Sequence, residues 1–326
     1  MGQNLVLTAF KLLIVALAAP AIAAAQDRYP TKPIHWIVPS GTGSFDNLTR
    51  AMAAQMSLVF GQPIIVENRP AAGGVVGMDQ AARAQADGYT LISSGLGQFV
   101  LQKFARSKLP YDLDRDFAPI SLFAKVPMAL IVHESVPAEN LKDLIAYAKS
   151  NPGKLNYGSS GVGTIFHLTA ELLKQRTVTN IVHVPYKGPG PMVQDLIAGR
   201  VQVAFYSPNS QILSLVKANK LRAIALAAAV RMPSIPDVPT FEESGVPEFD
   251  VAGWMGAFAP SGIPRSIVDR LNREIGRAVA VPQVANTFVQ ASIVPAVTSP
   301  EELAQIIRRD QEIWGPLIRK LEIREE

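Results

Sequence analysis

Three short loops rich in glycine and hydroxyl-bearing residues contain the groups of this chain that could do chemistry. They are Ser40-Gly41-Thr42-Gly43-Ser44, Ala71-Ala72-Gly73-Gly74 and Ser159-Ser160-Gly161-Val162-Gly163-Thr164. Each follows a predicted strand and precedes a predicted helix, so each lies at the carboxyl end of a strand, where open α/β sheets bind ligands. Glycine lets the backbone approach a ligand, and free amides at a helix start attract an anion. One such loop is more often only a turn with a helix cap, but three together predict an anion site.

Two further side chains have both a structural and a functional interpretation. His167 lies on the helix after the third loop, one turn from Thr164, where it either satisfies the helix start or donates to a ligand. Trp254 has glycine close by on both sides, at Gly253 and Gly256, so its ring either packs in the core or reaches a cleft.

The sequence supplies no coherent set of catalytic or metal-binding residues. It has no cysteine, which excludes thiol nucleophiles and sulfur-containing metal sites, and its four histidines lack the i, i+4 spacing of a metalloprotease helix. Gly161-Val162-Gly163 and Gly41-Thr42-Gly43 lack the third glycine of a dinucleotide motif. The segment around Ser159 misses the Gly-x-Ser-x-Gly motif of hydrolases by one position. We therefore expect no catalytic residue, no metal and no cofactor.

The composition is that of a folded protein with a small positive charge. Of 326 residues, 48% are hydrophobic and 18% are charged, so the chain can bury a core, and its length suggests two domains. The net charge is +4, and the 31 lysines and arginines form no basic run, which argues against a nucleic-acid partner.

Residues 1–25 have the pattern of a signal peptide. Lys11 precedes the apolar stretch Leu12–Ala19, which is too short to span a bilayer, and the segment ends in Ala23-Ala24-Ala25. We expect cleavage after Ala25 and export of the mature chain to the periplasm. An N-terminal membrane anchor is the alternative.

The loops are positioned by alternating strands and helices. The strands are expected at Pro33–Pro39, Gln62–Glu67, Tyr89–Ser93, Leu155–Tyr157, Ile181–Pro185, Val201–Tyr206 and Leu221–Ala227. The helices are expected at Asp46–Phe60, Val76–Ala86, Leu141–Ser150, 164–173, Pro191–Ala198 and Ser210–Ala218, followed by a helical tail with a capping box at Ser299–Glu302. This order predicts an α/β fold with two sheets.

A series of motifs runs in order through the mature chain. They are Asp46-Asn47-Leu48-Thr49-Arg50, Val66-Glu67-Asn68-Arg69-Pro70-Ala71-Ala72-Gly73-Gly74, Asp87-Gly88-Tyr89-Thr90-Leu91, Asp116-Phe117-Ala118-Pro119-Ile120, Asn151-Pro152-Gly153-Lys154-Leu155-Asn156-Tyr157, His183-Val184-Pro185-Tyr186-Lys187-Gly188 and Pro236-Asp237-Val238-Pro239-Thr240. In order and spacing they resemble the Bug family, the receptors of tripartite tricarboxylate transporters.

The resemblance implies a periplasmic solute-binding protein that closes on a small organic carboxylate. The expected fold is α/β, a two-lobed periplasmic-binding-protein fold of type II-like topology, with two hinge crossings and a ligand cleft between the lobes. Lobe 1 is expected to comprise residues 26–122 and 252–326, and lobe 2 residues 123–251. The crossings are expected near Phe123 and Val251.

The resemblance also nominates site residues, because the family holds its ligand between one loop of each lobe through amides, hydroxyls and water. On lobe 1 these are Ser40, Gly41, Thr42, Gly43, Ser44 and Asp46. On lobe 2 they are Ser159, Ser160, Gly161, Gly163, Thr164, His167, Tyr186 and Gly188. To these we add Gly73 and Gly74 of the second loop, together with Tyr206 and Trp254.

The chain departs from the family at two places. Its first loop is slightly shorter after Pro39, and Tyr206 occupies a position where relatives usually carry an aspartate that faces the cleft. A neutral tyrosine offers no countercharge to an ammonium group, so we expect a ligand without an amino group. The alternative is that Tyr206 points into its own lobe.

The expected partners are the small carboxylate and, for uptake, the membrane subunits of a transporter. We expect the protein to be a monomer. Two other functions share parts of the pattern: an extracytoplasmic sensor for a membrane kinase, and a secreted hydrolase that uses Ser159 or Ser160 with a histidine.

Overall fold

The computed structural model describes residues 29–324. The expected signal peptide, residues 1–25, lies outside them. Within the described part of the chain, no helix is both long and apolar enough to cross a membrane.

The first sheet has six strands in the order β11-β4-β10-β3-β1-β2. The strands are β1 (Ile34–Val38), β2 (Ile64–Asn68), β3 (Thr90–Gly95), β4 (Phe117–Val126), β10 (Gly253–Pro260) and β11 (Val294–Pro295). β1 pairs in parallel with β2 and β3, as the strand–helix alternation predicts. β10 returns from late in the chain and lies antiparallel between β3 and β4.

The second sheet has five strands in the order β7-β6-β8-β5-β9. The strands are β5 (Met128–His133), β6 (Asn156–Ser159), β7 (Val182–Pro185), β8 (Val203–Tyr206) and β9 (Leu221–Ala227). β6 pairs in parallel with β7 and β8, so their carboxyl ends share one edge of the sheet.

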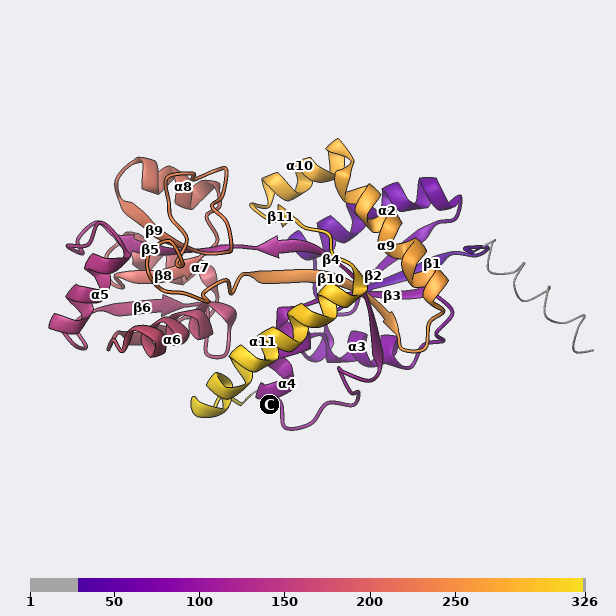
Figure 1. Cartoon of the computed structure of the whole chain (residues 1–326), viewed down its shortest axis with the longest axis horizontal. Helices are drawn as coiled ribbons and strands as arrows, with labels where there is room; N and C mark the ends of the chain where they lie inside the picture. The colour runs from indigo at the N-terminus through magenta and orange to yellow at the C-terminus, as the bar shows by residue number, and fades with distance from the viewer. Residues whose placement is uncertain (1–28, 325–326) are drawn as a thin grey trace, which may run out of the picture.

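Helices cover both faces of each sheet (Figure 1). On one face of the first sheet lie α2 (Ser44–Phe60), α9 (Arg265–Ala280) and α10 (Pro282–Gln290), and on the other lie η1 (Ala71–Gly74), α3 (Val75–Ala82), the π-helical turn η2 (Gly97–Leu101), α4 (Gln102–Ala105) and α11 (Pro300–Lys320). The second sheet is covered by α5 (Leu141–Ser150) and α6 (Ile165–Thr177) on one face and by α7 (Pro189–Ile197) and α8 (Ser210–Lys217) on the other.

Local sequence explains why several helices begin where they do. Asn140, Thr164 and Ser299 each accept a backbone N–H at a helix start, and Ser299 with Glu302 forms the predicted capping box. β1 has buried residues facing both helix layers, because Trp36 packs toward α2 and Ile37 toward α3.

The chain passes between the two sheets twice. β4 ends at Val126 in the first sheet and β5 begins at Met128 in the second, slightly beyond the crossing expected near Phe123. The return leads from β9 through residues 228–252 into β10, close to the expected Val251. Because β10 pairs with β4, the two crossing segments lie side by side (Figure 1).

Candidate functional site

A cavity of about 370 Å³ lies where the two sheets meet. It is lined by Phe45, Gly95–Gln98, Leu101, Gln102, Val126, Gly163, Thr164, Ile165, Gly253, Trp254 and Met255. None of these residues is charged. Three residues expected from the sequence, Gly163, Thr164 and Trp254, are among them. Phe45 belongs to the first turn of α2, which packs on the first sheet, and Ile165 belongs to the first turn of α6, which packs on the second. The N-termini of these two helices therefore meet at this cavity.

The first loop forms the start of α2 at the rim of this cavity. Gly41, Thr42, Gly43 and Ser44 are exposed, Ser40 is half-buried, and none of them lines the cavity wall. Gly43 is the N-cap residue, and no side chain caps the helix. The first-turn amides of α2 therefore have no intrahelical partner and can donate to a ligand.

Asp46 has a structural role in this geometry. Its carboxylate is 3% exposed, lies 2.9 Å from Arg50 Nε and accepts a bond of 3.0 Å from Asn68 Nδ2. Asn68 also donates to the carbonyl oxygen of Ser40 at 3.1 Å. Asp46 thus fixes the first loop to β2 and does not line the cavity.

The second loop supports the first. Gly74 has φ +94°, and a Cβ there would lie 2.5 Å from the carbonyl oxygen of Pro39, so only glycine allows the two loops to pack this closely. The carbonyl oxygen of Gly73 accepts a bond of 3.0 Å from Gln102 Nε2. Neither glycine lines the cavity, but Gly73 holds the wall residue Gln102 and Gly74 packs the second loop against the first.

The third loop is held by its own hydroxyl groups. Thr164 Oγ1 donates to the Gly161 carbonyl at 2.8 Å and accepts from the His167 amide at 3.5 Å. Ser159 Oγ accepts from the Gly161 amide at 3.2 Å. Ser160 contributes its carbonyl oxygen, which accepts from the Gly188 amide at 3.2 Å. These bonds set the loop so that the amides of Ile165 and Phe166 at the start of α6 stay free of intrahelical partners.

Two histidines stack beneath this loop. The rings of His167 and His183 lie 4.1 Å apart, and His183 also stacks on Tyr157 at 4.7 Å. The Gly163 amide donates to His167 Nδ1 at 3.2 Å, which requires that this nitrogen carry no proton. Burial lowers the pKa of His167, and burial followed by the charge of His167 lowers the pKa of His183 to about 4. His167 therefore holds the backbone of Gly163 in place through this bond and does not itself line the cavity.

The remaining sequence-based candidates of the second half do not line the cavity. The Tyr186 hydroxyl donates to Asp195 at 2.7 Å, and burial followed by this bond raises its pKa to about 12. Gly188 is half-buried at the start of α7. The half-buried ring of Tyr206 lies 5.4 Å from Phe166, beside the first turn of α6, and burial raises the pKa of its hydroxyl.

Trp254 belongs to the core and is also one of the residues that line the cavity. Its side chain is 4% exposed and packs near Phe99 and Phe258. The indole Nε1 donates to Asp310 Oδ2 at 2.7 Å, and burial raises the pKa of that carboxyl group. The ring is thus held in one orientation.

Several wall residues belong to none of the three loops and carry no motif in the sequence. Phe45, Val126 and Met255 are apolar residues that become neighbours only when β10 inserts between β3 and β4. The segment Gly95-Leu96-Gly97 joins the last residue of β3 to the first residue of η2, so it is a fourth glycine-containing turn between a strand and a helix. That pattern was a usable signal for this part of the wall.

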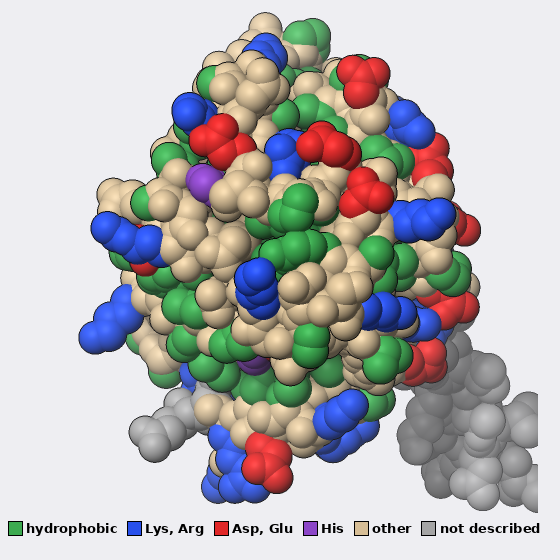
Figure 2. All heavy atoms as spheres, turned by 90° about the vertical axis from the view of Figure 1, so that its left-hand side faces the viewer, with side chains coloured by type: hydrophobic (Ala, Val, Ile, Leu, Met, Phe, Trp, Pro, Cys, Tyr) green, Lys and Arg blue, Asp and Glu red, His purple; other side chains and the backbone are tan. Residues whose placement is uncertain are grey.

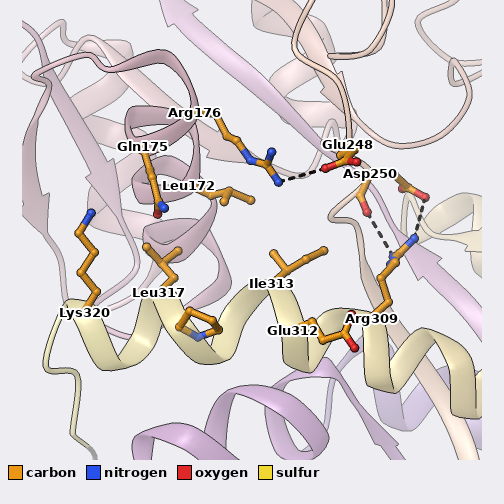
Figure 3. Close-up of a pocket in the computed structure, with 11 residues that line it drawn as sticks. Leu172, Gln175, Arg176, Glu248, Asp250, Arg309, Glu312, Ile313, Leu317 and Lys320 are labelled. Carbon is orange, nitrogen blue, oxygen red and sulfur yellow. Dashed lines mark hydrogen bonds and ion pairs between the residues drawn. The ribbon is translucent and has the colours of Figure 1, made fainter.

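A larger cavity of about 840 Å³ lies between α6 and α11 (Figure 3). Its charged residues are three basic (Arg176, Arg309, Lys320) and three acidic (Glu248, Asp250, Glu312). Arg176 pairs with Glu248 at 3.5 Å, and Arg309 with Asp250 at 3.8 Å. None of the three loops reaches this cavity, so its volume alone does not make it the better candidate. Figure 2 shows that basic and acidic side chains are also interspersed over the end of the molecule formed by the five-stranded sheet.

Comparison with known proteins supports one family. The model of the "Tripartite tricarboxylate transporter family receptor" matches residues 48–323. A protein encoded in the tcbD–tcbE intergenic region of Pseudomonas sp. (strain P51) is 40% identical over 90% of this chain and 87% of its own. Protein BugT of Bordetella pertussis is 34% identical over 94% of this chain and 95% of its own.

Solved structures agree with the expected architecture. An R. palustris protein solved with adipate is 32% identical, with 89% of this chain and 97% of that chain covered and a TM-score of 0.71. MatC from Rhodopseudomonas palustris, with bound malate, is 31% identical, with 89% and 100% covered and a TM-score of 0.67. These similarities confirm the two-lobed periplasmic-binding-protein fold and the Bug resemblance. The chain belongs to the receptor family of tripartite tricarboxylate transporters.

Proposed function

We propose that this protein captures a small organic carboxylate in the cavity between α2 and α6. One observation carries the proposal: the N-termini of two helices, one from each sheet, meet at a single cavity that no charged side chain lines. A helix N-terminus carries roughly half a positive charge, and its free amides donate to anions. The adipate and malate bound by two structural relatives are ligands of the matching chemical class.

The finer parts of the proposal follow from the family and the expected export signal. The protein acts in the periplasm after removal of residues 1–25, as a monomer. Its lobes are those expected from the sequence, 26–122 with 252–326 and 123–251, with the first boundary moved to Val126–Met128 because β4 runs to Val126 in the first sheet. It delivers its ligand to the membrane subunits of a transporter, because the matching family model is that of a transporter receptor rather than a sensor.

One observation favours a second candidate, serine hydrolysis. Ser159 Oγ lies 2.7 Å from His183 Nε2, a distance suited to proton transfer between a nucleophile and a base. However, Ser159 is 0% exposed and its hydroxyl already serves the Gly161 backbone. We therefore propose that the pair holds the third loop in place and that the protein has no catalytic activity.

A thermal-shift panel of mono-, di- and tricarboxylates tests the proposal. A ligand at 100-fold its dissociation constant should stabilise the protein by about 2.7 kcal/mol. The matched control for adipate is adipamide, which has the same skeleton without charge and should give no shift. Stabilisation by none of the carboxylates, together with turnover of an ester substrate that Ser159→Ala abolishes, would show that the second candidate is correct.

A further inference from the structure

We propose that the ligand is a carboxylate with an apolar, ring-sized body and no amino group. This inference rests on the proposed carboxylate-binding function and specifies which carboxylates the cavity accepts.

The cavity walls favour an apolar body. The apolar side chains that line the cavity are Phe45, Leu96, Leu101, Val126, Ile165, Trp254 and Met255. A ligand that covers them removes apolar surface from water, which is favourable in proportion to the area buried. A sugar-like or hydroxylated body would lose water there without finding enough partners.

Two aromatic residues of this wall are fixed before any ligand arrives. The half-buried ring of Phe45 lies edge-on to Phe123, with centroids 6.3 Å apart. Trp254 is held by its bond to Asp310. A rigid wall loses little side-chain entropy on binding, and aromatic rings prefer edge-to-face or offset contact with another ring. The wall therefore suits a flat, ring-sized group.

The electrostatics of the cavity exclude an ammonium group. Both helix N-termini that meet here are positive ends, and the polar side chains of the wall, Gln98, Gln102 and Thr164, are neutral. Two acids adjoin wall residues, and both already have partners. Asp46, next to Phe45 in the sequence, is held by Arg50 and Asn68, and Asp310 is held by Trp254 and Arg309. An ammonium group would thus lose its water with no anion to replace it.

Isothermal titration calorimetry with matched ligands tests this inference. 3-Phenylpropionate and L-phenylalanine share one carbon skeleton and differ by the amino group. We expect 3-phenylpropionate to bind the wild type about tenfold more tightly than L-phenylalanine, and more tightly than malate, whose body is polar.

A charge placed in the wall should change this preference. Gln98 is half-buried in the wall, and Gln98→Glu adds a carboxylate with almost no change in shape. We expect Gln98→Glu to weaken the binding of 3-phenylpropionate. The ratio of the affinity for 3-phenylpropionate to that for L-phenylalanine should fall by about fivefold or more. Gln290→Glu makes the same change at an exposed position of α10 outside the cavity and should leave both affinities unchanged.

Failure of the inference differs from failure of the proposed function. The inference is overturned if L-phenylalanine binds as tightly as 3-phenylpropionate or if malate binds more tightly. Either result leaves the proposed capture of a carboxylate intact. If 3-phenylpropionate, L-phenylalanine, malate and adipate all fail to bind, the proposed function itself fails. An unchanged ligand preference in a folded Gln98→Glu variant would show that this wall does not contact the ligand.

Discussion

The Ser159→Ala substitution should reveal whether this serine is structural. Its hydroxyl accepts from the Gly161 amide at 3.2 Å and lies 2.7 Å from His183 Nε2. The hydroxyl also lies 3.1 Å from the Gly161 carbonyl oxygen, and alanine removes all three interactions at a fully buried position. An ordinary hydrogen bond contributes about 0.5–1.5 kcal/mol, and a buried group left unpaired costs about 1–3 kcal/mol. His183 is only half-buried and can recruit water, so we expect a loss of about 2 kcal/mol in the free energy of unfolding.

Urea unfolding of the wild type, Ser159→Ala and Ser160→Ala measures this cost. Ser160 is half-buried, and the bond described for it comes from its backbone carbonyl. Ser160→Ala is therefore the matched control, with an expected change within about 0.5 kcal/mol. Carboxylate binding should persist in Ser159→Ala at temperatures where it remains folded. Equal costs for the two variants, or a Ser159→Ala variant as stable as the wild type, would refute the structural role.

Three further predictions concern the loops and the histidine that packs against the third of them. Thr164→Val should cost about 1 kcal/mol of unfolding free energy in urea titration because it removes a helix cap, whereas Thr164→Ser should match the wild type. Gly74→Ala should lower Tm more than Gly61→Ala. Both glycines have positive φ, but only at Gly74 would the new Cβ clash with the Pro39 carbonyl oxygen. Equal decreases in Tm would contradict this expectation. The pKa of His183 is lowered to about 4 from the ordinary histidine value of 6.5, so the unfolded chain binds more protons between these two pH values. Urea titrations should therefore show stability falling as the pH drops from 6.5 to 4. His183→Gln should reduce that dependence.

Much of the fold could be predicted from local patterns. Leu221–Ala227 forms a strand and Leu141–Ser150 a helix with the expected limits, because each combines a strong periodicity with clear end signals. β10 was harder to predict, since Gly253–Pro260 contains two glycines and a proline and has no apolar alternation. Its strand character comes from tertiary pairing with β3 and β4 on both sides.

The candidate site was predictable in its loops but not in its walls. Thr164 and Gly163 could be found because glycine and hydroxyl residues at a helix start have a recognisable pattern. Asp46 also lies at a helix start after a glycine-containing loop, yet its carboxylate bonds to Arg50 and Asn68. Asn68 is within reach only because β2 packs beside α2, which the local sequence does not reveal. Phe45 has no motif at all, and only the meeting of the two halves makes it a wall residue.

The central claim is that a carboxylate binds between the first turns of α2 and α6, and a crystal structure of the complex with the most stabilising carboxylate tests it most directly. We predict density for the carboxylate within hydrogen-bond distance of the amides of Phe45 and Ile165, with its body against Trp254. Density in the larger cavity between α6 and α11 instead, with the carboxylate on Arg176 or Lys320, would contradict the claim.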